Sequence, residues 1–142
     1  MLKAILSATL LLVAGVMPVQ AGEPGAVVAG IYAAHPWTSL PPGGHGAWYV
    51  DMSVAWGRGA SEAGMAFLLG AAGRPERVET EVVASGEYEA RIRATLSGRD
   101  GAVHVLNFGM IGDDDEDDRW RVIEVFTDDG KSLSEVLAHP SP

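Results

Sequence analysis

The chain has 142 residues, contains no cysteine, and carries 10 basic against 19 acidic residues, which gives a formal net charge of −9. The acidic balance argues against nucleic acid or an anionic membrane as partner, because both attract basic patches. Without cysteine the protein has neither disulfides nor an attachment point for a lipoprotein anchor, so its stability must come from the hydrophobic core.

The N-terminal segment predicts a cleavable export signal. Lys3 places a positive charge near the start, and an apolar run extends from Ala4 to Met17. Val19 and Ala21 then provide the small residues that a signal peptidase recognises before its cleavage site. This order is typical of a signal peptide. A membrane anchor needs about 20 apolar residues, and the run from Ala4 to Met17 is shorter than that. We expect cleavage after Ala21, which leaves residues 22–142 as a single periplasmic or secreted domain that no longer contacts the membrane.

The first part of the mature chain predicts two helices with a strand between them. Pro24–His35 has apolar residues at helical spacing and is followed by a proline. After a loop rich in proline and glycine, Ala47–Trp56 alternates apolar and polar residues, which predicts a strand with two tryptophans on its buried face. Ser61–Ala72 is predicted to be a short helix, and the Ser61 side chain can cap it.

The rest of the chain predicts an antiparallel meander that closes with a short helix. Its four strands are expected at Val78–Ala84, Tyr88–Leu96, Ala102–Met110 and Arg119–Phe126. Glu76, Glu79 and Glu81 indicate an exposed strand edge protected by charge. Ser132 and Glu135 form a capping-box pattern at the start of the last helix. Together these elements predict an α+β fold, in which a curved antiparallel sheet of about four to five strands packs in a cone against N-terminal and short helices.

Hairpin geometry predicts which residues of the meander share a face. Closing the loops symmetrically pairs Ala94 with His104 and Leu106 with Glu124, so that even-numbered residues lie on one face. That face is expected to be buried and carries Tyr88, Ala90, Ile92, Leu96, Leu106, Phe108, Met110, Trp120, Val122 and Phe126. The other face is expected to meet solvent or a partner and carries Glu87, Glu89, Arg91, Arg93 and Arg121.

His104 and Glu124 interrupt the apolar face, and the predicted register makes them diagonal neighbours. A histidine beside a carboxylate on an apolar wall can serve as a general base near neutral pH. The alternative is a half-buried pair that satisfies its own polar atoms or the backbone, because structural pairs often mimic sites. The candidate ligand pocket is lined by Tyr88, His104, Phe108, Trp120 and Glu124.

The acidic run is the candidate for a metal site. Asp113, Asp115, Asp117 and Glu124 have the one-three-five-twelve spacing of an EF-hand loop, but Asp118 stands where that loop needs glycine. We therefore expect a solvated hairpin tip, with a low-affinity cation site as the alternative. Zinc-ligand spacing is absent from the sequence, so we expect no structural metal and no cofactor. The G-x-S-x-G motif is also absent, so a hydrolase nucleophile elbow is not expected.

Several segments together suggest a family. The C-terminal half contains a hairpin, then a strand with the sequence W-R-V, then an exit with the pattern D-G-x-S-L. These features span Glu89–Leu96, Val103–Phe108, Arg119–Val125 and Asp129–Leu133, and the first helix contributes Ile31–Ala34. This pattern resembles small exported proteins of the nuclear-transport-factor-two-like superfamily, a cystatin-like α+β class. The resemblance implies a strongly bent sheet that wraps helices around a cavity. In such folds the cavity sometimes hosts a dehydratase or isomerase site and often only binds.

Two functions follow from these observations. We favour a non-enzymatic module that binds a small molecule or a periplasmic protein through the apolar pocket or the polar sheet face, and a homodimer is a further alternative. The competing function is a small enzyme of lyase or isomerase type, with His104 and Glu124 as acid and base. The two are distinguished by whether these side chains meet inside an open cavity.

Overall fold

The computed structural model describes residues 23–58, 61–112 and 119–139, so the predicted signal peptide lies outside the described residues. These residues form α1 (Pro24–Ala33), α2 (Val50–Arg58), α3 (Ser61–Leu69), β1 (Arg77–Ser85), β2 (Glu89–Ser97), β3 (Val103–Gly112), β4 (Trp120–Phe126) and α4 (Leu133–Ala138). Two single-turn 3₁₀ helices, His45–Ala47 and Gly70–Ala72, precede α2 and follow α3.

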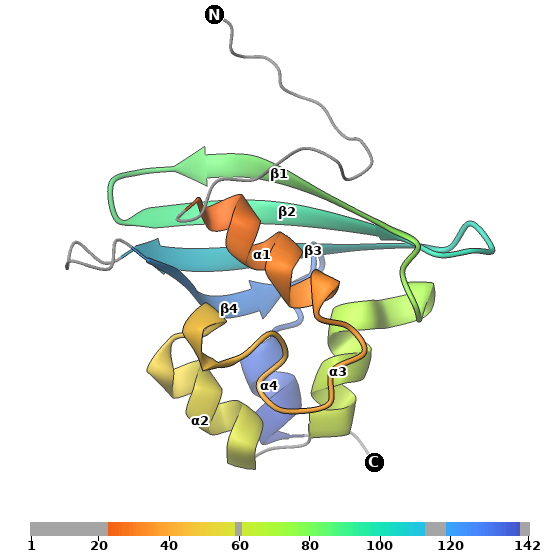
Figure 1. The fold of residues 1–142 in the computed structure, drawn as a ribbon, viewed down its shortest axis with the longest axis horizontal. Coiled ribbons are helices and arrows are strands. Elements are labelled where there is room, and N and C mark those ends of the chain that lie inside the picture. Colours follow the sequence, from red (N-terminus) through yellow and green to blue (C-terminus); the bar gives the residue numbers. More distant parts are fainter. Residues whose placement is uncertain (1–22, 59–60, 113–118, 140–142) are drawn as a thin grey trace, which may run out of the picture.

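The strands form one antiparallel sheet in the order β1-β2-β3-β4, with the helices gathered on one side (Figure 1). Helix α1 packs on β1 and β2, whereas α2, α3 and α4 contact one another next to β4. Along β2, residues that face the helices are buried, and the alternate residues are exposed or half-buried. The predicted α+β fold, a curved antiparallel sheet packed against helices, is confirmed.

Large side chains fill the space between the sheet and the helices. Trp48, Trp56 and Phe108 are each no more than 1% exposed. The rings of Trp48 and Trp56 meet edge to face, with centroids 5.5 Å apart and planes at 72°. Phe108 meets Tyr32 in the same way at 6.2 Å and 83°. Close packing of this kind leaves these residues in a solid core instead of around a cavity.

The strand predicted at Ala47–Trp56 is wrong, because most of this segment is helix α2. Met52 and Trp56 are buried and lie four residues apart on one face of the helix, whereas Val50 and Val54 are 60% and 46% exposed. Trp48 precedes the helix and is also buried. A spacing of four residues fits both a strand and a helix, so the alternation alone did not distinguish them.

The register of the meander differs from the prediction in two places. Ala94 pairs with Leu106 instead of His104, which is a shift of two residues that leaves every side chain on its predicted face. A bulge in β4, opposite Gly109 and Met110, then reverses the alternation, so that Val125 is the buried residue opposite Phe108. The expectation that Phe126 lies on the buried face is therefore wrong.

Candidate functional site

His104 lies on β3 and contacts the end of α3. Its Nε2 atom lies 2.9 Å from the backbone oxygen of Phe67, and because a carbonyl oxygen only accepts, Nε2 carries the donated proton. Gly70 approaches the ring so closely that a Cβ atom there would lie 2.3 Å from the imidazole Cγ. Gly70 has a φ of +55°, which favours glycine. The half-buried imidazole therefore joins the Gly70 turn to the sheet.

Glu124 holds the first turn of α4. Its Oε1 accepts hydrogen bonds from the backbone N–H groups of Val125 at 3.0 Å and Ser134 at 3.1 Å. Its Oε2 accepts from the Ser134 hydroxyl at 2.5 Å. A side-chain oxygen in this position satisfies backbone donors that lack partners within the helix. The predicted cap is also present, since the Ser132 hydroxyl accepts from the backbone N–H of Glu135.

His104 and Glu124 are not neighbours, so the predicted diagonal pair is wrong. Glu124 pairs with Gly109, which lies five residues from His104 along β3, or about 17 Å at the usual rise of a strand. Glu124 was expected opposite Leu106, so it is displaced by three residues, of which two come from a shift of β4 against β3 and one from the bulge. Each side chain instead has its own structural contact, and the two share no site.

The other residues of the predicted pocket are also dispersed. Phe108 is fully buried in the core, and Trp120 is half-buried against it. Tyr88 is 44% exposed, and its carbonyl oxygen accepts from Gly112 N–H at 2.8 Å. Tyr88 and Trp120 lie at the end of the sheet where β2 and β4 begin, whereas His104 lies toward the other end. The five residues therefore do not enclose one pocket.

The predicted cation site at Asp113, Asp115 and Asp117 lies outside the described residues. Among residues 23–58, 61–112 and 119–139, no group of three or more histidine, cysteine, aspartate or glutamate side chains is placed to hold a metal ion. In the same part of the chain, each helix is too short or too polar to cross a membrane.

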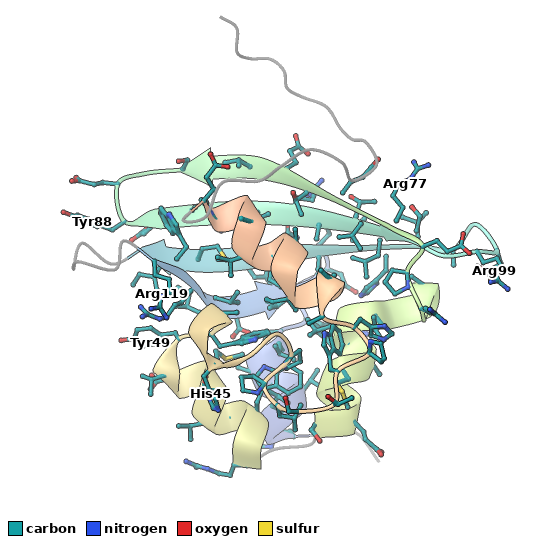
Figure 2. The ribbon with its side chains drawn as sticks, viewed as in Figure 1. His45, Tyr49, Arg77, Tyr88, Arg99 and Arg119 are labelled. Carbon is teal, nitrogen blue, oxygen red and sulfur yellow. The ribbon has the colours of Figure 1, made fainter. Side chains whose placement is uncertain are left out.

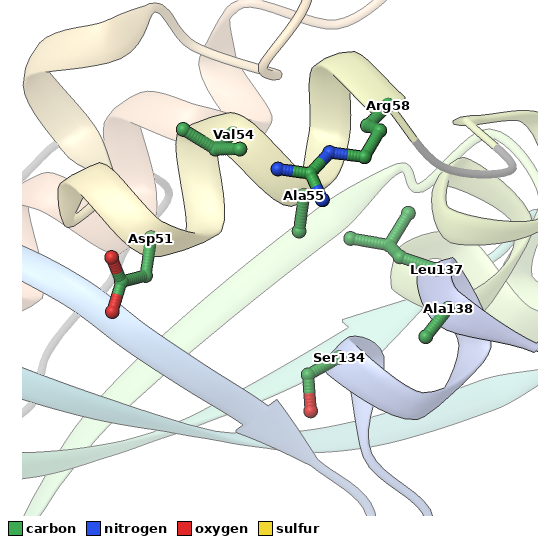
Figure 3. A pocket seen from close by; sticks show the side chains of 7 residues that line it. All are labelled: Asp51, Val54, Ala55, Arg58, Ser134, Leu137 and Ala138. Carbon is green, nitrogen blue, oxygen red and sulfur yellow. The ribbon is translucent and has the colours of Figure 1, made fainter.

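A groove of about 370 Å³ lies between α2 and α4 (Figure 3). Ala55 and the buried Leu137 give it an apolar wall, while Asp51, Arg58 and Ser134 are its polar residues. The two charges lie in the first and last turns of α2, where they complement the helix dipole. The Ser134 hydroxyl is bonded to the Glu124 carboxylate. Each polar residue of the groove therefore has a structural role, and none of them requires a bound ligand to explain its presence.

The sheet face opposite the helices carries a polar network. Arg93 Nη2 lies 3.2 Å from Asp128 Oδ1, and the Asn107 side-chain amide donates to the same oxygen at 2.9 Å. The Arg91 guanidinium lies 5.0 Å from the centre of the Phe126 ring, a distance typical of cation–π contacts. Arg91 and Arg93 are thus engaged in contacts within the protein.

The outer edge of β1 is the part of the sheet that is left open. β1 pairs with β2, and no described strand pairs with its other side. Eight of its nine residues are exposed, including Val82 at 55% and Val83 at 49%. At the opposite edge, Trp48 bridges the backbone of β4 at Val122, so that edge is partly covered.

Charge and polarity divide the two faces of β1. Thr80 and Val82 pair with buried residues of β2 and therefore lie on the helix side of the sheet. Glu79 and Glu81 lie on the other side and are exposed. The predicted strand edge protected by glutamates is thus confirmed. The sequence reasoning missed the exposed valines, although two adjacent valines beside these glutamates were the available signal.

Tyr32 connects α1 to α3 next to the start of β1. Its hydroxyl donates to the backbone oxygen of Leu68 at 2.8 Å. Burial raises the pKa of this phenol far above its usual range, so the group stays neutral. Tyr32 therefore lines the cleft next to the start of β1 as an uncharged side chain.

Comparison of the chain with protein-family models, curated proteins and solved structures gives no match. The resemblance to the nuclear-transport-factor-two-like superfamily therefore stays a prediction.

Proposed function

We propose that the mature chain is an exported, non-enzymatic protein-interaction module that binds an extended polypeptide along the free edge of β1. The observation that carries this proposal is a nine-residue strand that is paired on one side and exposed at eight residues. Proteins usually shorten, cover, twist or charge such edges, because a free edge recruits other strands. On β1 the protection is the charge of Glu79 and Glu81, which repels acidic strands but attracts a basic one. In β1 the pairing is regular from Arg77 to Val82, before a bulge.

Strand addition would use both the backbone and the side chains of this edge. Each main-chain hydrogen bond contributes about 0.5–1.5 kcal/mol net, and alternate side chains of the added strand provide specificity. On the helix side these side chains would lie beside Thr80 and Val82, which suit apolar or β-branched residues. On the other side they would lie beside Glu79 and Glu81, which suit lysine or arginine. The complementary segment therefore alternates apolar and basic residues.

The same charges disfavour a second copy of the chain as the occupant. A two-fold antiparallel pairing of the whole strand would oppose Glu81 to its own copy. Moving the axis by one residue would oppose Glu79 to Glu81. Like charges directly opposite each other destabilise a strand pair. A basic segment from another protein fits this edge better than a homodimer does.

The contacts of the two acid–base candidates argue against a catalytic role for these two residues. The His104 imidazole donates to the backbone of α3, and the Glu124 carboxylate accepts from the first turn of α4. No observation in the described part of the chain favours the lyase or isomerase alternative.

Fluorescence anisotropy with a labelled nonapeptide, in which lysine and valine alternate and both ends are blocked, tests this proposal. We expect saturable binding to the wild type and about tenfold weaker binding to Glu79→Gln/Glu81→Gln, because two exposed charge pairs are lost. The matched control Asp51→Asn/Glu62→Gln removes the same charge from α2 and α3 and should bind as the wild type does. Equal weakening in both double variants, or no binding to the wild type, would overturn the proposal.

A further inference from the structure

A cleft of about 320 Å³ lies where β1 begins, next to the end of α1. Ala29, Ala33 and Val78 give it apolar walls, and Arg74 and Arg77 are its two arginines. Both arginines are exposed, and in the view of Figure 2 the Arg77 side chain projects away from the ribbon near the start of β1. Arg74 and Arg77 thus lie in the same cleft at the start of the edge, together with the carboxylate of Glu76.

The two guanidinium groups are accessible to an anion. Among the described residues Arg74 forms no ion pair or hydrogen bond. Arg77 lies 3.6 Å from Glu79, but both side chains are at least 60% exposed, and such pairs contribute little. The carboxylate within the cleft, Glu76, lies 3.2 Å from Arg99 in a pair that is also exposed, so its negative charge is only weakly offset. Both guanidinium groups are therefore available to a ligand carboxylate, and guanidinium–carboxylate contacts are among the strong hydrogen bonds.

The order of charges along the edge sets a direction for the added strand. The edge is positive at Arg77 and negative at Glu79 and Glu81. A strand that runs antiparallel to β1 brings its C-terminus to Arg77, and its third and fifth residues from that end lie beside the glutamates. A parallel strand would bring its N-terminal amine toward Arg77, where like charges repel.

The path of the chain also limits how far the ladder extends. Pro75 has no backbone N–H, and the N–H of Glu76 already donates to Ser97 at 2.8 Å. A strand that continued past Arg77 would find few partners, whereas one that ended there would place its carboxylate beside Arg77 and Arg74. We infer that β1 binds the C-terminus of its partner, added antiparallel, with the terminal carboxylate on these two arginines. This inference rests on the proposed function and adds the direction and the chemistry of the bound end.

Two labelled peptides of one sequence test the inference. Both carry lysine at the third and fifth positions from the C-terminus, and one ends in a free carboxylate and the other in an amide. We expect the wild-type chain to bind the acid about tenfold more tightly than the amide, as a charge-assisted contact warrants. In Arg74→Gln/Arg77→Gln the difference should fall below about twofold, and in the matched control Arg58→Gln/Arg91→Gln it should persist.

The outcomes separate this inference from the proposal beneath it. Equal binding of acid and amide to the wild type would overturn the inference, as would a difference that survives in Arg74→Gln/Arg77→Gln. Either result leaves strand addition standing. Failure of both peptides to bind would overturn the proposed function itself. Circular dichroism spectra confirm that each variant is folded before it is compared.

Discussion

Replacing each of two buried tryptophans with phenylalanine separates hydrogen bonding from packing in the core. Trp48 and Trp56 are each 1% exposed and contact each other, so the two substitutions remove the same atoms from the same region. The indole N–H of Trp48 donates to the buried carbonyl of Pro42 at 2.7 Å. The indole N–H of Trp56 is buried without a partner in the described part of the chain.

The two variants should therefore differ in stability. Trp48→Phe loses packing and also leaves the Pro42 oxygen unpaired, which costs about 1–3 kcal/mol. Trp56→Phe loses similar packing but removes a donor whose burial is already unfavourable. We expect Trp48→Phe to lower the free energy of unfolding by about 2 kcal/mol more than Trp56→Phe does.

Urea denaturation followed by far-ultraviolet circular dichroism measures this difference, because the signal does not depend on the tryptophans themselves. The comparison is valid where the dependence on urea concentration is unchanged between variants. Equal losses of stability, or a larger loss for Trp56→Phe, would refute the assignment of the two indole N–H groups.

Two further substitutions test the structural roles of the former site candidates. Gly70→Ala should cost at least about 2 kcal/mol, because alanine is strained at a φ of +55° and its Cβ meets the His104 ring. Thermal melts should show a smaller cost in a His104→Ala background, and an undiminished cost would argue against the contact. Glu124→Ala should cost about 2 kcal/mol through the lost cap on α4, and an unchanged melting temperature would exclude that role.

Local patterns were sufficient to predict most elements of the fold. The strands were expected from alternation and turn residues, and the first turn of α4 from the spacing of Ser132 and Glu135. The segment from Trp48 to Trp56 was not predicted, because its buried residues at 48, 52 and 56 fit both periods. Only the packing of α2 against α3 and α4 selects the helix.

Register was harder to predict than the elements themselves. The error between β2 and β3 was two residues, so burial was still predicted correctly for Ile92, Leu106 and Phe108. The bulge in β4 has no mark in its sequence, and it exchanged the places of Val125 and Phe126. A site that depends on which residues are exact neighbours across these strands could therefore not be predicted from the sequence.

The open edge could be predicted only in part. The glutamates of β1 indicated an exposed edge, but the exposure of Val82, on the helix side of the sheet, depends on where α1 ends its coverage. That coverage is a tertiary property which no local pattern records. The cluster of Arg74 and Arg77 also forms only when the chain after α3 meets the end of α1.

Amide hydrogen exchange of β1, measured by NMR with and without the lysine–valine peptide, tests the central claim most directly. In the free protein, alternate N–H groups of β1 should exchange rapidly because they have no partner, while their neighbours bonded to β2 are protected. Saturating peptide should protect the rapid set within residues 77–85. Uniform protection of β1 in the free protein, or peptide-induced protection confined to the groove between α2 and α4, would contradict the account.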